Sequence, residues 1–102
     1  MVGKDRILLN SASKVKNAVG TGDDEPEGAS SWKEFYEERH AWPKTCRIYG
    51  CGEVATDGAH VKIKKKRKEW IIPMCDDHNH PSNKAWMHVN KGTWAFLEKV
   101  RS

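Results

Sequence analysis

The chain has 102 residues, of which 37% are hydrophobic and 31% are charged, and its net charge is +4. This length allows one domain. With so few apolar residues, burial of the core alone is not expected to offset the conformational entropy of folding, so we expect an additional cross-link such as a metal ion. No stretch approaches the roughly 20 apolar residues of a membrane-spanning helix, so we expect no membrane association. Three cysteines suit disulfide pairing poorly, and the first residues lack the apolar run of a secretory signal. We therefore expect a cytoplasmic protein in a reducing compartment, stabilised by a metal ion.

Charge is distributed unevenly along the chain. Residues 1–45 contain seven Lys or Arg and eight Asp or Glu, whereas residues 46–102 contain eleven and six. The basic excess therefore lies in the half that contains all the cysteines. This is compatible with a polyanionic partner such as DNA or RNA, and nothing in the sequence indicates a small-molecule substrate.

Residues 1–29 are predicted to form a flexible N-terminal segment, which we call the flexible lead. The sequence GTGDDEPEGASS at 20–31 is rich in glycine and acidic residues, a composition typical of linkers. The preceding stretch 6–19, RILLNSASKVKNAV, could form a short strand or a frayed helix. We therefore place the folded domain at residues 30–102.

The stretch SSWKEFYEERH at 30–40 predicts an N-terminal helix for this domain. Ser31 and Glu34 form a capping-box pattern, and Pro43 ends the helical stretch. Residues at helical spacing give it one largely aromatic face, formed by Trp32, Phe35, Tyr36 and Arg39. We interpret this face as one that covers the core.

Two hairpins are predicted after the helix. GAHVKI at 58–63 and KEWIIP at 68–73 are rich in β-forming residues and flank a basic turn. The sequence NKG at 90–92 lies between two further β-prone segments and predicts a C-terminal hairpin. The expected fold class is therefore a small α+β domain with a helix, a central hairpin and a second hairpin.

Four residues have the spacing of a structural zinc site. Cys46 and Cys51 form a C-x4-C turn, and Cys75 and His78 form a C-x2-H pair after the first hairpin. Structural Zn²⁺ takes four sulfur or nitrogen ligands, and a tight turn or the first turn of a helix can present two of them together. Two ligands on a turn, then a hairpin, then two on a helix start form a treble-clef arrangement.

Two alternatives to this ligand set remain open on the sequence alone. His60 and His80 compete with His78 for the fourth position. The cysteines could also be small buried hydrophobic residues, with His78 on the surface.

The cysteine pairs around a hairpin, the histidine in GAHV and the cysteine after IIPM resemble the HNH endonuclease family and its treble-clef relatives. The resemblance covers about residues 46–83 and extends to small bacterial and phage proteins with a similar pattern. It implies that His60 is a general base that activates water. It also implies that Asn79, His80 or Asn83 helps to hold a catalytic Mg²⁺ or Mn²⁺, separate from the structural zinc.

Two departures from the HNH pattern argue against catalysis. Ala59 stands where that family has an acidic or histidine metal ligand, and Pro81 shortens the helix that should carry the others. Asp57 could substitute for the missing ligand or could be an ordinary turn residue. Without catalysis, His60 is expected to donate a hydrogen bond to a carbonyl or thiolate near the metal, although direct zinc ligation or plain packing also fits.

The turn of the first hairpin is strongly basic. It contains six cations within seven residues: Lys62, Lys64, Lys65, Lys66, Arg67 and Lys68. A projecting loop of this kind can neutralise several phosphates, to which Asn79 and Asn83 could add hydrogen bonds. It could equally be a solvated turn that protects a strand edge from aggregation.

The chain also has five tryptophans: Trp32, Trp42, Trp70, Trp86 and Trp94. We expect most of them in the core. One exposed near the basic turn could stack on an unpaired base or anchor a protein interface.

The leading prediction is a zinc-stabilised module that binds nucleic acid through the basic turn without catalysis. The first alternative is a metal-dependent HNH nuclease with His60 as the base. The second is a protein-interaction module, such as a phage-type inhibitor or adaptor.

Overall fold

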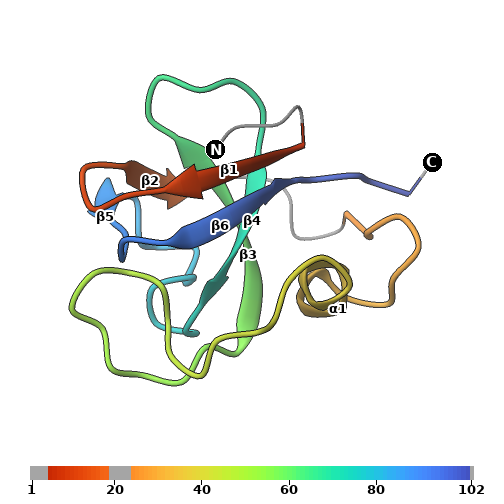
Figure 1. Cartoon of the computed structure of the whole chain (residues 1–102), viewed down its shortest axis with the longest axis horizontal. Helices are drawn as coiled ribbons and strands as arrows, with labels where there is room; N and C mark the ends of the chain where they lie inside the picture. The colour runs from red at the N-terminus through yellow and green to blue at the C-terminus, as the bar shows by residue number, and fades with distance from the viewer. Residues whose placement is uncertain (1–4, 19–23, 102) are drawn as a thin grey trace.

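The protein has six strands and one short helix, which forms from a capped aromatic segment (Figure 1). The computed structural model describes residues 5–18 and 24–101. The strands are β1 (Arg6–Leu9), β2 (Lys14–Asn17), β3 (Asp57–Ile63), β4 (Trp70–Met74), β5 (Met87–His88) and β6 (Thr93–Leu97). The helix α1 spans Trp32–Glu37.

All strands belong to one curled antiparallel sheet with the order β1-β6-β4-β3-β2-β5. The β3–β4 hairpin forms its centre, and its turn projects at the top of Figure 1, at the far end from α1 and from the loops that precede β3. Beyond β5 the chain pairs once more, because Ile48 bridges Val89. The segment between Cys46 and Cys51 therefore extends the sheet past its last strand.

Strand alternation gives the sheet two different faces. On the inner face, Ala59, Val61 and Ile63 of β3 are buried in the larger core cluster, which also contains Cys46 and Cys75. On the outer face, α1 covers β3 and β4 and contributes Phe35 and Tyr36 to a second, aromatic cluster with Ile71 and Phe96. The metal-ligand candidates and the helix thus lie on opposite sides of the sheet.

The helix forms where the sequence predicts it. The Ser31 hydroxyl accepts a hydrogen bond from the Glu34 backbone N–H at 3.0 Å, as a helix N-cap does. Gly58 of β3 lies directly beneath the helix, and a Cβ at this position would be 2.4 Å from the Trp32 carbonyl carbon. The absence of a side chain at Gly58 therefore sets how closely α1 approaches the sheet.

The predicted α+β treble-clef fold is wrong, because the protein is a small, mainly β structure. The treble clef requires a helix after Cys75, but residues 76–79 form only turns. Pro81 restricts the chain there, and the Asn83 side chain binds the His78 carbonyl oxygen at 2.8 Å and holds the compact loop. The short α1 is the only helix within residues 5–18 and 24–101.

The prediction of a C-terminal hairpin is also wrong, although the chain does reverse direction at residues 90–92. β5 pairs with β2, and β6 pairs with β1 and β4, so the two C-terminal strands are not neighbours in the sheet. The strand that pairs with β5, and one of the two strands that pair with β6, come from the stretch 1–29, for which we predicted a flexible lead. Its described part supplies β1 and β2, and Ile7, Leu9 and Val15 are buried in the core. Residues 1–4 and 19–23 of that stretch lie outside the described residues.

Candidate metal centre

The first ligand pair lies on a turn at the edge of the sheet. The Cys46 N–H donates to the Glu53 carbonyl at 2.9 Å, and the Cys51 N–H donates to the Ile48 carbonyl at 3.0 Å. Gly50, the third residue of this turn, has a φ of 79°, which is in the left-handed region that glycine favours. The turn brings both cysteine side chains to the same point.

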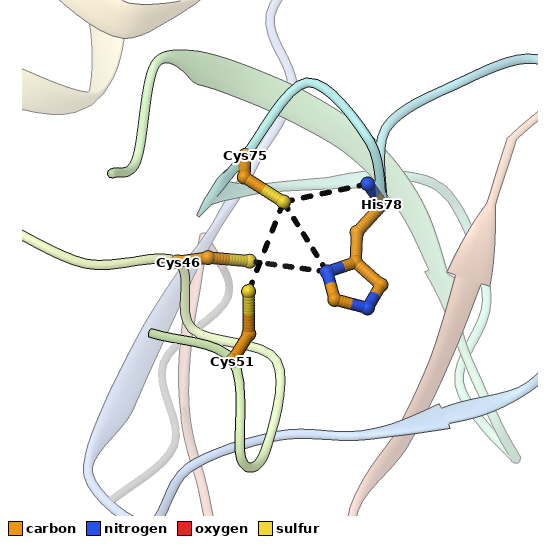
Figure 2. Close-up of side chains that lie close together, drawn as sticks. All are labelled: Cys46, Cys51, Cys75 and His78. Atoms are coloured by element: carbon orange, nitrogen blue, oxygen red, sulfur yellow. Dashed lines mark hydrogen bonds between the residues drawn. The ribbon is translucent and has the colours of Figure 1, made fainter. Parts of the chain in front are cut away.

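The second pair follows directly from the end of β4. The His78 N–H lies 3.4 Å from the Cys75 sulfur, and the Asn79 N–H donates to the Cys75 carbonyl at 3.1 Å. These contacts close one tight turn in which residues i and i+3 face the same side. The sulfur of Cys75 and the imidazole of His78 therefore point at the cysteine turn (Figure 2).

The four side chains converge on one point. All four ligand atoms lie within 4.8 Å of one another. His78 Nδ1 is 3.2 Å from Cys75 Sγ and 3.7 Å from Cys46 Sγ, and the sulfurs of Cys51 and Cys75 are 3.9 Å apart (Figure 2). Tetrahedral bonds of zinc-like length imply about 3.8 Å between sulfurs and about 3.6 Å between sulfur and nitrogen. The cluster is therefore compatible with one bound metal ion.

Burial strengthens the case for a cation at this point. Cys46 and Cys75 are buried, and burial raises the pKa of the Cys46 thiol to about 12, although backbone hydrogen bonds from Ile48 and Cys75 act in the opposite direction. A thiolate forms in such surroundings only where a positive charge compensates the loss of hydration. A coordinated metal ion supplies that charge.

A side chain from β2 fixes the loop that carries His78. The Asn17 side-chain amide donates to the carbonyl of His78 at 2.7 Å and lies within 3.3 Å of the carbonyls of His80 and Asn83. The stretch assigned to the flexible lead therefore supports the candidate site directly. Sequence reasoning missed Asn17, because its partners are more than 60 residues away along the chain.

The two alternative fourth ligands lie elsewhere. His80 is exposed, and its Nδ1 lies 2.8 Å from the Ser82 hydroxyl. His60 lies on the outer face of the sheet, where its ring packs edge-on against Trp32 with 4.5 Å between centroids. Among the described residues, His78 is the histidine that meets the three cysteines.

His60, the predicted general base, is enclosed rather than accessible. Its side chain is 9% exposed, and Nε2 is 3.3 Å from Glu98 Oε2. Burial lowers the pKa of His60, whereas burial together with Glu69 and Asp24 raises the pKa of Glu98 to about 7. Both shifts favour the uncharged forms, so this contact is not a simple ion pair near neutral pH.

The predicted nucleic-acid contacts divide into two groups. The asparagines already have protein partners, since Asn79 donates to Asp57 at 3.1 Å and Asn83 binds the loop carbonyls. The basic residues are all exposed: Lys62, Lys64, Lys65, Lys66, Arg67 and Lys68. Trp70 anchors the turn, because its indole N–H donates to the Arg67 carbonyl at 2.9 Å.

Sequence reasoning missed two lysines next to this turn. Lys16 of β2 lies directly across from Lys62 of β3, and the Lys64 N–H donates to the Lys14 carbonyl at 2.9 Å. The alternation of Lys14, Val15 and Lys16, with valine buried, was the available signal for a half-exposed strand.

No protein-family model matches the chain, and no curated protein and no solved structure is significantly similar to it. The resemblance to HNH enzymes thus receives no support from these comparisons. Within the part of the chain that the structure describes, no helix is long and apolar enough to cross a membrane.

Proposed function

We propose that the protein is a zinc-stabilised module that binds nucleic acid without catalysis. Three thiolates and one imidazole form a donor set that suits Zn²⁺, because soft sulfur ligands in a tetrahedron disfavour Mg²⁺ and other hard cations. A site closed by four protein ligands leaves no position for a reacting group, which is the pattern of a structural rather than a catalytic zinc.

One observation supports the binding proposal: lysines of β2, of β3 and of the first residue after β3 gather on the outer face. We call these residues the lysine face: Lys14, Lys16, Lys62 and Lys64. It continues directly into the exposed turn at 65–68, whose four residues are all basic. A single basic turn is common as a solvated loop, whereas a face and a turn together offer a continuous surface for a phosphate backbone.

The lysine face has an electrostatic cost in the free protein. Lys16 and Lys62 are direct cross-strand neighbours, and like charges in this position destabilise a sheet. Glu69 is the nearest acidic residue in the chain to this hairpin turn, and no carboxylate lies within 4.0 Å of any of these lysines among the described residues. A polyanionic partner would remove the repulsion.

The HNH nuclease alternative receives less support than binding. A general base must reach the proton that it abstracts, and His60 is enclosed by Trp32 and Glu98. His60 also lies on the opposite face of the sheet from Cys46 and Cys75.

The test is a titration of fluorescently labelled DNA and RNA with the metal-loaded protein over a range of salt concentrations. We expect binding that weakens steeply with salt, and a salt slope that falls by about 0.7–0.9 for each phosphate contact removed. Lys62→Glu combined with Lys64→Glu should abolish most of this binding. Lys44→Glu combined with Lys33→Glu changes the net charge equally on a different part of the surface and should have a much smaller effect.

Absence of binding to both DNA and RNA would contradict the proposal. Equal loss in the two double variants would contradict the role of the lysine face. A protein captured with high affinity in place of nucleic acid would favour the interaction-module alternative.

A further inference from the structure

An exposed tryptophan lies at the edge of the lysine face. Val15 pairs with Met87, which places Trp86 across from Lys16 on the outer side. The amino nitrogens of Lys16 and Lys64 lie 4.9 and 5.8 Å from the centre of the indole ring. Trp86 nevertheless remains 41% exposed. Its ring is therefore available to a ligand and surrounded by positive charge.

A second exposed aromatic ring extends this surface. Ile48 bridges Val89, and the Tyr49 N–H donates to the His88 carbonyl at 2.9 Å, so Tyr49 lies across from His88. His88 in turn pairs with Lys14 of the lysine face. Tyr49 is 68% exposed. The register thus arranges Tyr49 and Trp86 as diagonal neighbours, a relation that separates backbones by about 7–8 Å.

Both aromatic residues are held by segments that belong to the candidate metal centre. Tyr49 lies within the turn between Cys46 and Cys51, and Gly50 gives that turn its shape. Trp86 follows the loop whose carbonyls the Asn17 amide holds. Two large exposed rings are costly in water, and here hydrogen bonds of the neighbouring backbone hold the segments that carry them.

Exposed rings of this kind distinguish between forms of nucleic acid. In a duplex, the faces of the bases are covered by their neighbours and are closed to a protein ring. In a single strand, each base can stack on an aromatic side chain while lysines contact the phosphates. The combination of two rings with a lysine face therefore suits unpaired bases.

From this arrangement we propose that the protein binds single-stranded nucleic acid, with bases stacked on Trp86 and Tyr49. This inference rests on the proposed function, because the lysine face supplies the phosphate contacts. The proposed function specifies nucleic acid, and this inference specifies that the nucleic acid is single-stranded. The rings supply base stacking without a requirement for sequence, and the lysines supply the salt-dependent part of the affinity.

The experiment compares three labelled ligands with the full, metal-loaded protein by fluorescence anisotropy: a single-stranded DNA of about 12 nucleotides, an RNA of the same sequence and the matching duplex. We expect at least one single strand to bind about tenfold or more tightly than the duplex. Trp86→Ala should weaken single-strand binding by about tenfold, leave duplex binding unchanged and leave the salt slope unchanged, because no phosphate contact is lost. Tyr49→Ala should act in the same direction.

Two variants serve as controls. Trp86→Phe keeps an aromatic ring and should retain most of the single-strand affinity. Leu8→Ala removes an apolar side chain that is 39% exposed on β1, a strand that pairs with β6 rather than with β2 or β3, and should change nothing. Thermal unfolding and metal content of each variant show whether its fold is intact.

Tight duplex binding equal to that of both single strands would overturn this inference and leave the proposed function standing. So would a Trp86→Ala variant that is folded and binds single strands normally. Failure to bind any of the three ligands would overturn the proposed function, and this inference with it.

Discussion

Three buried polar atoms on the outer face have no hydrogen-bond partner among the described residues: His60 Nε2, Glu69 Oε1 and Glu98 Oε2. Buried polar groups are rarely left in this state, because an unmade hydrogen bond costs about 1–3 kcal/mol. The neutral forms of His60 and Glu98 reduce that cost, since an uncharged pair is easier to bury than two separate ions. A proton held on Glu98 thus contributes to the stability of the fold.

This pair gives stability a predictable dependence on pH. The folded-state pKa of Glu98, about 7, lies above its ordinary value of 4.5, so the folded protein holds this proton more tightly than the unfolded chain. The contribution is fully present below the ordinary value and is lost as pH rises through about 7. His60 has the opposite sign, because its lowered pKa removes stability as pH falls below 6.5.

Glu98→Gln should remove the first of these effects. The wild type loses stability as pH rises from about 5 to about 8, and the variant does not lose this part. We therefore expect the free energy of unfolding of the variant, relative to that of the wild type, to increase over this range. Urea unfolding at both pH values measures this, and taking the difference between the two proteins cancels the pH dependence of the metal centre. Glu53→Gln, at an exposed position, is the control. If the two proteins differ in free energy of unfolding by the same amount at both pH values, the raised pKa of Glu98 would be contradicted.

Gly58 provides a second test at the scale of one residue. A methyl group there would lie 2.4 Å from the Trp32 carbonyl carbon and 2.6 Å from the Lys33 nitrogen, both of which are backbone atoms. Gly58→Ala should therefore displace α1 and destabilise the protein by about 1–3 kcal/mol, seen as a lower midpoint of thermal unfolding. Gly52→Ala adds the same methyl group where nothing lies within 4 Å, and should be nearly neutral. Equal midpoints would show that the helix adjusts freely.

At the scale of elements, the sequence predicts local structure better than pairing. The segments 58–63 and 68–73 do form the central hairpin, because apolar alternation and a basic turn are both local signals. The C-terminal turn forms as well, but β5 pairs with β2 and β6 pairs with β1, both more than 70 residues away along the chain, and β6 also pairs with β4. β1 and β2 have only four residues each, so their alternation is a weak signal and does not indicate which strands they pair with.

A substitution in the cross-strand pair of Lys16 and Lys62 is expected to affect stability and nucleic-acid binding in opposite directions. In a Trp86→Ala background, where Lys16 has no indole ring to contact, Lys16→Glu places a carboxylate across from Lys62 and turns repulsion into attraction. We therefore expect a stabilisation of about 0.2–1 kcal/mol relative to that background. The same change should weaken nucleic-acid binding and reduce its salt slope, because one phosphate contact becomes repulsive. Urea unfolding and anisotropy titration of the same sample measure both effects. A double variant that is less stable than Trp86→Ala alone, or that binds as tightly as Trp86→Ala alone, would contradict this account.

For the whole molecule, the metal is expected to decide whether the chain folds. The candidate ligands join the turn before β3 to the loop after β4, and the larger core cluster contains Cys46 and Cys75. Apparent binding energies of structural zinc, about 10–16 kcal/mol, equal or exceed the total stability of typical small domains. The lysine face should therefore depend on the ion, although no lysine touches it.

A strong chelator should thus abolish folding and binding together. We expect circular dichroism to lose its β-sheet signal and single-strand affinity to disappear, with both restored by added Zn²⁺ but not by Mg²⁺. The chelator titration is followed by both signals in parallel. Retention of the sheet signal in metal-free protein would show that the apolar core stabilises the fold without a metal ion.

The spacing of Cys46, Cys51, Cys75 and His78 predicts which side chains meet, because both pairs are local and one hairpin joins them. The binding face could not be predicted in the same way. Lys16, Trp86 and Tyr49 become neighbours only through the pairing of β2 with β5 and of Ile48 with Val89. Such contacts depend on the curl of the whole sheet rather than on any local pattern.

The central claim is that one zinc ion binds the three cysteines and His78. The most direct measurement is native mass spectrometry with elemental analysis of protein purified without chelators, on the wild type, His78→Ala and His80→Ala. We predict one zinc per chain in the wild type and in His80→Ala, and a loss of tightly bound zinc in His78→Ala. A wild-type protein that is folded and free of transition metal, or zinc retained in His78→Ala and lost in His80→Ala, would contradict it.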